Sequence, residues 1–553
     1  MKKLKNYILL VLLVVSPVSA RQQAAIASAH PLATRAGEEI LAAGGNAFDA
    51  AVAITAALAV VEPYSSGIGG GGFWLLHRAE DGHEVMLDGR ERAPFSAHRD
   101  MYLDKQGDVI KGASVDGALS AGIPGVPAAM VHLVKQYGRL SLQQALQPAI
   151  RYAKQGFKVD AHYRRMAGFR LRALQSSKDA AAIFLRNNKV PAEGDVIRQP
   201  ELATTLEKIA SQGAAGFYSG ELAQKLVKGV TEAGGIWQLK DLSDYKVIER
   251  EPLRGEYRGM KITSVAPPSS GGVALVEIFN QLSAFKMESM GEADVMHRVV
   301  ESMRRAYRDR AEFLGDTDFV DVPMQRLMDP AYAQGLAAGI HPDRATPSEL
   351  LPGIMQPVQG QDTTHFSIID NEGNRVAATL SINYPFGACF VVPGTGVLLN
   401  DEMDDFSAKP GEPNVYGLVG AEANAIAPGK RMLSSMSPSF FETDDRVAVM
   451  GTPGGSRIIT MVLLGALEFL NGADAKAIVD LPRYHHQYLP DKIFVEPILL
   501  GRDALKQLEQ KGHLLQAAEN TWGNMQLVIW DKRSQQASAA SDYRGVGEAR
   551  VIR

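Results

Sequence analysis

Residues 67–72, which read Gly-Ile-Gly-Gly-Gly-Gly, satisfy the spacing G-x-G-x-x-G of a dinucleotide-binding loop. A true loop of this kind follows a strand and opens a helix, whereas this one follows a segment of helical character and precedes the strand-like residues 73–77. We therefore interpret it as a close-packed backbone turn. A P-loop is excluded as well, because Gly429-Lys430 is followed by Arg431 instead of serine or threonine.

Histidine and cysteine could support metal binding or nucleophilic chemistry. His485 and His486 are adjacent, so they do not share a helix face, and no H-E-x-x-H pattern or cysteine partner accompanies them. We interpret them as structural residues and expect neither a metal nor a cofactor. Cys389 is the only cysteine and precedes an apolar run, which favours a small buried residue over a nucleophile and rules out an intrachain disulfide.

Residues 362–367 read Asp-Thr-Thr-His-Phe-Ser and follow a proline-rich stretch. By composition alone they form a polar turn that enters a strand. Prolines at 342, 347, 352 and 357 forbid a continuous helix or central strand before them. A long irregular segment is uncommon inside a compact protein, and it indicates either a linker or a functional site.

The elements around these segments suggest sheets that are covered by helices. Residues 47–61 are apolar on nearly every face, which predicts a buried helix. Further helices are predicted at residues 128–137, 142–154, 273–285, 293–314, 459–470 and 504–511. Within 293–314, charged residues alternate with apolar ones and predict a solvated helix face: Arg304, Arg305, Arg308 and Asp309.

Strands are concentrated in the second half of the chain. Residues 363–370 and 375–382 flank Asn-Glu-Gly-Asn at 371–374, which predicts a hairpin. Other predicted strands are 396–399, 439–441, 446–451 and 525–530. A helix-rich first half and a strand-rich second half favour one layered α/β body.

The N-terminus has the pattern of a signal peptide. Lys2, Lys3 and Lys5 precede an apolar run at 8–15 and the small residues at 18–20, so we expect export and a mature chain from about residue 21. The alternative is an uncleaved membrane anchor, although the run is too short to span a bilayer. Without the three lysines the net charge changes from -4 to -7, which argues against nucleic acid as the main partner.

Seven motifs in order give residues 24–545 a resemblance to the γ-glutamyltranspeptidase (glutathione hydrolase) family of N-terminal nucleophile hydrolases. They lie at residues 67–73, 88–94, 267–272, 362–367, 400–406, 428–438 and 454–457. The resemblance implies a four-layer αββα sandwich. It also implies cleavage between Asp362 and Thr363, which would give a heterodimer of a large chain (21–362) and a small chain (363–553).

The implied chemistry is γ-glutamyl transfer. Thr363 would attack the γ-amide of glutathione, form a γ-glutamyl ester, and pass the acyl group to water or an amino acid. An N-terminal threonine carries its own base, the α-amine, whose reference pKa is about 7.7 to 8.0. Before cleavage that nitrogen is an amide, so cleavage would create the catalyst.

The resemblance further implies three groups of site residues. Backbone N–H groups of Gly454 and Gly455 would stabilise the oxyanion. The substrate α-carboxylate would bind to Arg90, Ser434 and Ser435. The substrate ammonium would bind to Glu402, Asp405 and Asn383.

Two positions depart from the family pattern. Ser381 replaces a threonine, which keeps the hydroxyl but loses the methyl group. Glu402 stands where some bacterial members have glutamine, and a carboxylate should strengthen ammonium binding. Residues 410–420, including Tyr416, match a lid loop over the glutamyl pocket and favour a small acyl group.

Two other functions are compatible with the sequence. A related acylase could act on glutaryl-cephalosporins or poly-γ-glutamate, although glutaryl groups lack the ammonium that Glu402 and Asp405 would bind. A noncatalytic, unprocessed periplasmic binding protein would keep the pocket, but the intact Asp362-Thr363 junction argues against it. The expected compartment is the periplasm, with secretion as the alternative.

Overall fold

The computed structural model describes residues 22–351, 363–412, 414 and 417–552. The predicted signal peptide, Asp362 and Tyr416 lie outside these residues. Among the described residues, none of the helices combines the length and the hydropathy that a membrane span requires.

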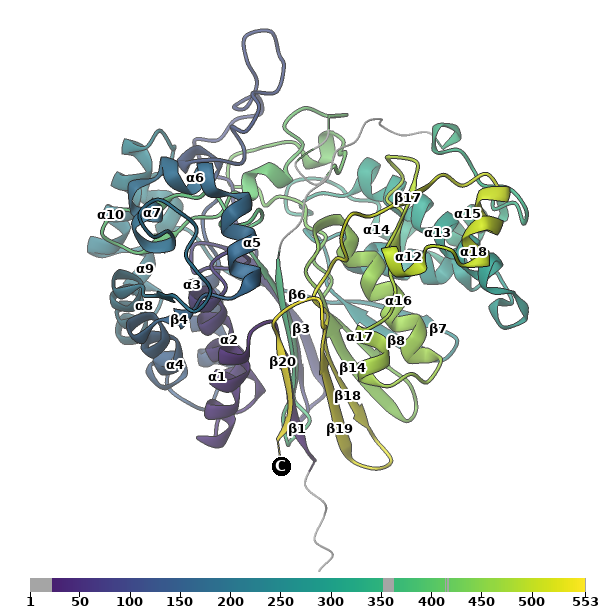
Figure 1. Ribbon diagram of the computed structural model, residues 1–553, viewed down its shortest axis with the longest axis horizontal. Helices are drawn as coiled ribbons and strands as arrows, with labels where there is room; N and C mark the ends of the chain where they lie inside the picture. Colours follow the sequence, from purple (N-terminus) through teal and green to yellow (C-terminus); the bar gives the residue numbers. More distant parts are fainter. Residues whose placement is uncertain (1–21, 352–362, 413, 415–416, 553) are drawn as a thin grey trace, which may run out of the picture.

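Two antiparallel sheets form the centre of the molecule (Figure 1). The seven-stranded sheet has the order β20 (Glu548–Ile552), β1 (Ala24–Ser28), β9 (Thr364–Ile369), β10 (Arg375–Ser381), β2 (Gly71–Arg78), β3 (His83–Gly89) and β6 (Ile248–Arg250). The six-stranded sheet has the order β19 (Gln536–Ser541), β18 (Gln526–Asp531), β14 (Arg446–Gly451), β13 (Ser439–Glu442), β8 (Met260–Ser264) and β7 (Leu253–Tyr257). Strands β9 and β10 pack against β14, so the two sheets lie face to face.

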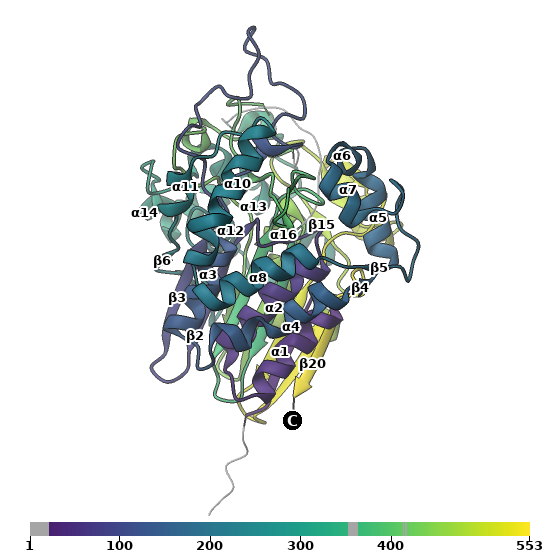
Figure 2. The same cartoon turned by 90° about the vertical axis from the view of Figure 1, so that its left-hand side faces the viewer.

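Helices cover the outer face of each sheet. The first layer, in front of the strands in Figure 2, contains α1 (Pro31–Ala42), α2 (Ala47–Val61), α3 (Val126–Gln136), α4 (Leu142–Gln155) and α8 (Pro200–Gln212). The second layer contains α12 (Gly271–Leu282), α13 (Glu292–Phe313), α16 (Ile458–Leu470) and α17 (Ala475–Val479). The predicted αββα sandwich is confirmed.

The remaining elements lie outside this frame. The helices are α5 (Ala161–Phe169), α6 (Leu171–Ser176), α7 (Lys178–Phe184), α9 (Ala215–Tyr218), α10 (Gly220–Glu232), α11 (Leu239–Ser243), α14 (Met324–Leu327), α15 (Pro330–Ala338) and α18 (Asp503–Gln510). The short strands are β4 (Phe157–Lys158), β5 (Val196–Ile197), β11 (Val391–Val392), β12 (Val397–Leu398), β15 (Tyr484–His485), β16 (Ile493–Val495) and β17 (Leu515–Ala517).

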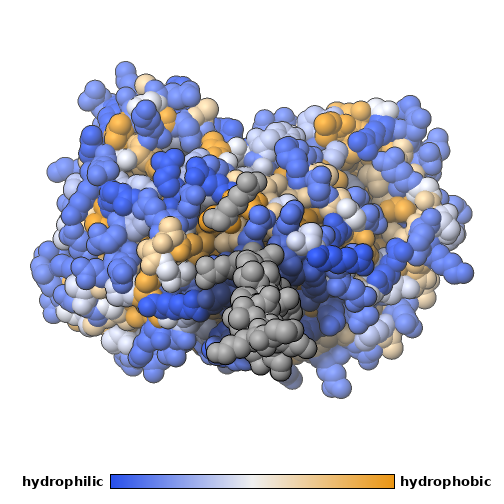
Figure 3. Space-filling view, turned by 90° about the horizontal axis from the view of Figure 1, so that it is seen from below, coloured by the Kyte–Doolittle hydropathy of each residue, from blue (hydrophilic) through white to orange (hydrophobic). Residues whose placement is uncertain are grey.

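Alternating side chains on the central strands join two cores. On β9, Phe366 and Ile368 pack beneath the first helix layer, whereas Ile369 packs between the sheets. Every residue of β9 and β10 is buried, because the sheet is covered on both faces. By contrast, the face seen from below is largely hydrophilic, with hydrophobic side chains in small groups (Figure 3).

Most predicted elements are confirmed within a few residues. Helix α2 has the predicted bounds and begins with a reciprocal cap between Asn46 and Asp49. The β9–β10 hairpin is present, and the Asp370 carboxylate accepts hydrogen bonds from the N–H groups of Glu372 and Asn374. Cys389 is buried, as predicted, and burial raises the pKa of its thiol to about 12.

The glycine-rich turn before β2 is a close-packed turn, as the sequence predicts. A Cβ atom on Gly69 would lie 2.1 Å from the Leu398 carbonyl oxygen, and one on Gly70 would lie 2.2 Å from that of Ser381. Only glycine allows backbones to approach so closely. The turn therefore allows the start of β2 to pack closely against the end of β10, at Ser381.

The prediction of a solvated face on α13 is wrong. Arg304, Arg305 and Asp309 are only 2%, 3% and 1% exposed. Both arginines pair with Glu301, and Arg304 also contacts Asp491. The charged face is buried because Glu301 of the same helix and Asp491 of a distant segment supply partners for its arginines.

The adjacent histidines have structural roles, as predicted. His485 contacts Thr460 and Gln487, and His486 lies 3.2 Å from Asp491. Burial lowers the pKa of His485 to about 3 and that of His486 to about 4, so both are neutral near pH 7.

Candidate active site

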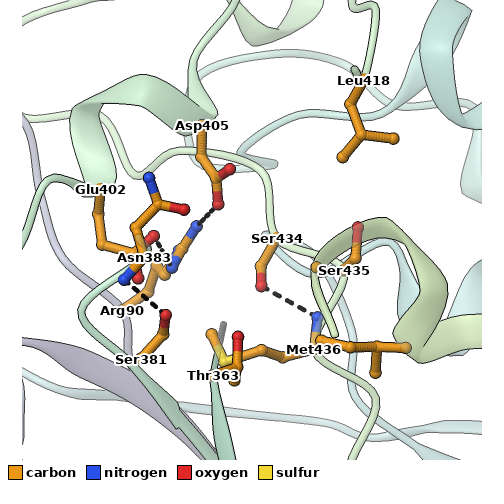
Figure 4. Close-up of a pocket in the computed structure, with 12 residues that line it drawn as sticks. Arg90, Thr363, Ser381, Asn383, Glu402, Asp405, Leu418, Ser434, Ser435 and Met436 are labelled. Atoms are coloured by element: carbon orange, nitrogen blue, oxygen red, sulfur yellow. Dashed lines mark hydrogen bonds and ion pairs between the residues drawn. The ribbon is translucent and has the colours of Figure 1, made fainter. Parts of the chain in front are cut away.

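Thr363 lies immediately before β9, in a pocket where distant segments meet (Figure 4). It is 6% exposed. The pocket is half open, and together with its opening to solvent it spans about 280 Å³. It is lined by Arg90, Thr363, Ser381, Asn383, Glu402, Asp405, Leu418, Ser434, Ser435, Met436, Gly455 and Ile458. Except for Gly454 and the undescribed Asp362, the structure brings every predicted site residue to this pocket.

Arg90 follows β3 and is held by two carboxylates. Its Nη1 lies 2.7 Å from Glu402 Oε2, and its Nη2 lies 2.5 Å from Asp405 Oδ2. The guanidinium Nε also donates to the Met432 carbonyl oxygen at 3.2 Å. The three charged groups therefore form one cluster, in which Arg90 and Glu402 are buried and Asp405 is half-buried; it is visible at the left of Figure 4.

Burial shapes the charges of this cluster. Burial alone would lower the pKa of Arg90, but Glu402 and Asp405 outweigh it and raise that pKa above its usual range. Burial raises the pKa of Glu402 to about 7, although Arg90 opposes the shift. Among the described residues Glu402 Oε1 has no hydrogen-bond partner, so this oxygen can accept from a cationic ligand.

Ser434 and Ser435 are arranged to donate hydrogen bonds. Ser434 Oγ accepts from the Met436 N–H at 3.1 Å, and Ser435 Oγ accepts from Arg310 Nη2 at 3.2 Å. Because each oxygen already accepts from the protein, each hydroxyl hydrogen can point to an anionic ligand.

The end of β10 and the following loop form another wall of the pocket. Ser381 Oγ accepts from the Asn383 N–H at 2.7 Å, and Asn383 Nδ2 donates to the Asp401 carbonyl oxygen at 3.0 Å. Of the predicted lid loop, Leu418 lines the pocket and Asn414 Nδ2 donates to Asp405 Oδ1 at 3.2 Å.

Gly454 and Gly455 form a turn between β14 and α16. Their φ angles are 143° and 56°, and a Cβ atom on Gly454 would lie 2.5 Å from Met461 Cε. Within the described chain, neither N–H group donates to an acceptor. Two such N–H groups near the start of a helix can stabilise negative charge.

The motifs missed four residues that contribute to the site. Leu418, Met436 and Ile458 line the pocket, and Arg310 contacts Ser435. Met436 lies in a motif segment and Leu418 in the predicted lid, so both could have been named. No short pattern in the sequence distinguishes Arg310 from the other arginines of α13.

Residues 33–552 match the family model described as gamma-glutamyltranspeptidase. The chain belongs to the γ-glutamyltranspeptidase family. It is 44% identical over 503 residues to a glutathione hydrolase proenzyme of Pseudomonas sp. (strain A14), covering 90% of this chain and 87% of the relative. It is 42% identical over 538 residues to one of Escherichia coli (strain K12), covering 96% and 92%.

Solved structures agree with this family assignment. A cephalosporin acylase from Bacillus halodurans matches with a TM-score of 0.84 and 28% identity, covering 96% of both chains. A γ-glutamyltranspeptidase chain from Helicobacter pylori matches with a TM-score of 0.58 and 41% identity, covering 59% of this chain and 94% of that chain. The protein is thus an enzyme with the N-terminal nucleophile hydrolase fold.

Proposed function

We propose that the protein is an exported γ-glutamyltransferase and glutathione hydrolase whose precursor cleaves itself between Asp362 and Thr363. The observation that carries this proposal is the pocket in which Thr363 lies near Arg90, Glu402 and Asp405. A nucleophile beside both signs of charge suits an acyl group that carries its own ammonium and carboxylate. The signal-peptide pattern favours the periplasm.

Self-cleavage and catalysis would use the same hydroxyl. In the precursor, Thr363 Oγ1 attacks the Asp362 carbonyl carbon, the acyl group moves from nitrogen to oxygen, and water hydrolyses the resulting ester. This reaction frees the Thr363 α-amine, which then serves as the base. The products are a large chain of residues 21–362 and a small chain of residues 363–553, which remain together as a heterodimer.

In the mature enzyme, the Thr363 amine would accept the hydroxyl proton as the oxygen attacks the γ-amide carbon. The backbone N–H groups of Gly454 and Gly455 would stabilise the oxyanion. The carbon–nitrogen bond then breaks, the leaving amine takes the proton, and cysteinylglycine departs from a γ-glutamyl ester. Water completes hydrolysis, whereas an amino acid amine completes transfer.

Substrate recognition would exchange one set of ion pairs for another. The α-carboxylate binds Arg90 and the donor hydroxyls of Ser434 and Ser435. The α-ammonium binds Glu402 and Asp405, which hold Arg90 in the structure. A zwitterionic substrate therefore compensates every charge that it disturbs.

A cephalosporin acylase activity is the second candidate, because a cephalosporin acylase matches nearly the whole chain with a TM-score of 0.84. A glutaryl group has a carboxylate but no ammonium. If it engaged Arg90, it would leave Glu402 and Asp405 without a compensating cation, which is costly in a buried site.

We therefore expect γ-glutamyl p-nitroanilide to be cleaved with a kcat/KM at least about 100-fold above that of glutaryl p-nitroanilide, or about 2.7 kcal/mol. The Glu402→Gln/Asp405→Asn double variant should have a smaller ratio between the two kcat/KM values, because it lacks the two carboxylates that the substrate ammonium would balance. Equal rates for both anilides in the unaltered enzyme would favour the acylase.

Binding of an amino acid ligand should depend on the ionisation of Glu402. The pKa of Glu402 is raised to about 7, so its carboxylate is ionised above that pH and protonated below it. The inhibition constant of L-glutamate against γ-glutamyl p-nitroanilide should therefore rise below pH 7, by up to about tenfold per unit. In Glu402→Gln the inhibition constant should no longer rise below pH 7. An unchanged pH profile in that variant would contradict the assignment of this pH dependence to Glu402.

A further inference from the structure

Arg310, in the last turn of α13, is a buried cation near the pocket. It is 5% exposed, and no carboxylate of the described residues lies within 4.0 Å of it. Arg304 and Arg305 of the same helix are both paired with Glu301. A buried charge without a counter-ion is costly, so such a residue commonly has a functional reason.

The partners of Arg310 are hydroxyl groups that lead to the pocket. Its Nη2 donates to Ser435 Oγ at 3.2 Å, and its Nε donates to Ser270 Oγ at 3.0 Å. Ser270 in turn donates from its hydroxyl to the Ser434 carbonyl oxygen at 2.7 Å and from its N–H at 2.8 Å. Arg310 thus fixes the segment that carries both pocket serines.

The charge balance of the pocket also involves Arg310. Arg90 is matched by two carboxylates, Glu402 and Asp405, which leaves an excess of one negative charge when both are ionised. Glu91 also lies 3.5 Å from Arg90 Nη1, and burial raises the pKa of its carboxyl group well above the usual range. Arg310 interacts electrostatically with Asp405, and its positive charge offsets part of this excess, which favours the entry of an anionic group.

We propose that Arg310 is a positioning residue for the α-carboxylate of the substrate. The charge of Arg90 is already paired with two carboxylates, so Arg310 supplies a second positive charge. Arg310 also orients the Ser435 hydroxyl as a hydrogen-bond donor. The inference rests on the proposed function, since it assigns a further residue to the same substrate. Arg310 acts through Ser435, so its effect is on substrate binding and not on bond cleavage.

Two substrates test this role. γ-Glutamyl p-nitroanilide carries the α-carboxylate, whereas 4-aminobutyryl p-nitroanilide lacks only that group. In Arg310→Met, KM for the first should rise about 10- to 100-fold while kcat changes less than about threefold. The kinetics with the second should match those of the unaltered enzyme.

Arg298→Met is the matched control. Arg298 lies on the same helix, is 8% exposed, and contacts Phe285 and the Ile340 carbonyl oxygen away from the pocket. Within the described residues it too has no carboxylate within 4.0 Å. This variant should leave the KM of both substrates unchanged.

Equal losses on both anilides, or a loss confined to kcat, would overturn the proposal for Arg310. If Arg310→Met yields no processed protein, Arg310→Lys carries the test. Lysine keeps the charge but cannot bridge both serine hydroxyls, so KM should rise about three- to tenfold for the γ-glutamyl substrate alone. An unaltered enzyme that cleaves no γ-glutamyl anilide would instead refute the proposed function.

Discussion

Thr363→Ala is expected to yield one uncleaved chain whose hydrolase activity is at least about a thousandfold below that of the unaltered enzyme. The substitution removes the only atom that would both cleave the precursor and accept the γ-glutamyl group. Without cleavage, the α-amine that serves as base is never released. A denaturing gel and the rate of γ-glutamyl p-nitroanilide cleavage measure the two effects.

Controls separate this loss from misfolding. Thr363→Ser keeps a hydroxyl and should be processed, with reduced activity. Thr364→Ala removes the neighbouring hydroxyl, which donates to Glu62 at 2.6 Å and lines no part of the pocket. Thr364→Ala should still give two chains. If Thr363→Ala gave two normal chains with full activity, the assignment of Thr363 as the nucleophile would be contradicted.

Arg90→Lys should lower kcat/KM for γ-glutamyl p-nitroanilide by about 100- to 1,000-fold, or about 2.7 to 4 kcal/mol. A lysine ammonium cannot contact Glu402, Asp405 and a substrate carboxylate with the fork of a guanidinium. Glu402 and Asp405 then lose part of the positive charge that balances them, so substrate binding is weakened more than bond cleavage. Steady-state kinetics should show the loss chiefly in KM.

Arg92→Lys is the control for this substitution. Arg92 lies two residues away but donates to the carbonyl oxygens of Asp241 and Asp244, outside the pocket. Its kcat/KM should stay within about threefold of the unaltered value. If Arg90→Lys also stayed within threefold, the α-carboxylate would bind elsewhere.

Patterns of neighbouring residues predicted those helices and strands that depend mainly on local sequence. Helix α2 could be placed because residues 47–61 are apolar on nearly every face, and the structure adds that Asn46 and Asp49 cap its start. The β9–β10 hairpin followed from alternation around a turn sequence. Strand β1 (Ala24–Ser28) was missed because four of its five residues are small, so its apolar contrast is too weak.

Long-range charge pairing could not be predicted from patterns. Arg304 alternates with apolar residues like a surface residue, yet its partner Asp491 lies 187 positions away. The site residues were found through motif resemblance, since no spacing rule brings Arg90 to Glu402 across 312 positions. That resemblance did not reveal that Arg90 pairs with the acids, or that Arg310 supports Ser435.

The most direct test of self-cleavage and covalent catalysis by Thr363 is the intact mass of the purified protein after an acid quench of its reaction with glutathione. We expect two chains, the smaller made of residues 363–553, with one γ-glutamyl group added to Thr363 in the quenched sample. An active protein that remains a single chain, or a γ-glutamyl group on any other residue, would contradict it.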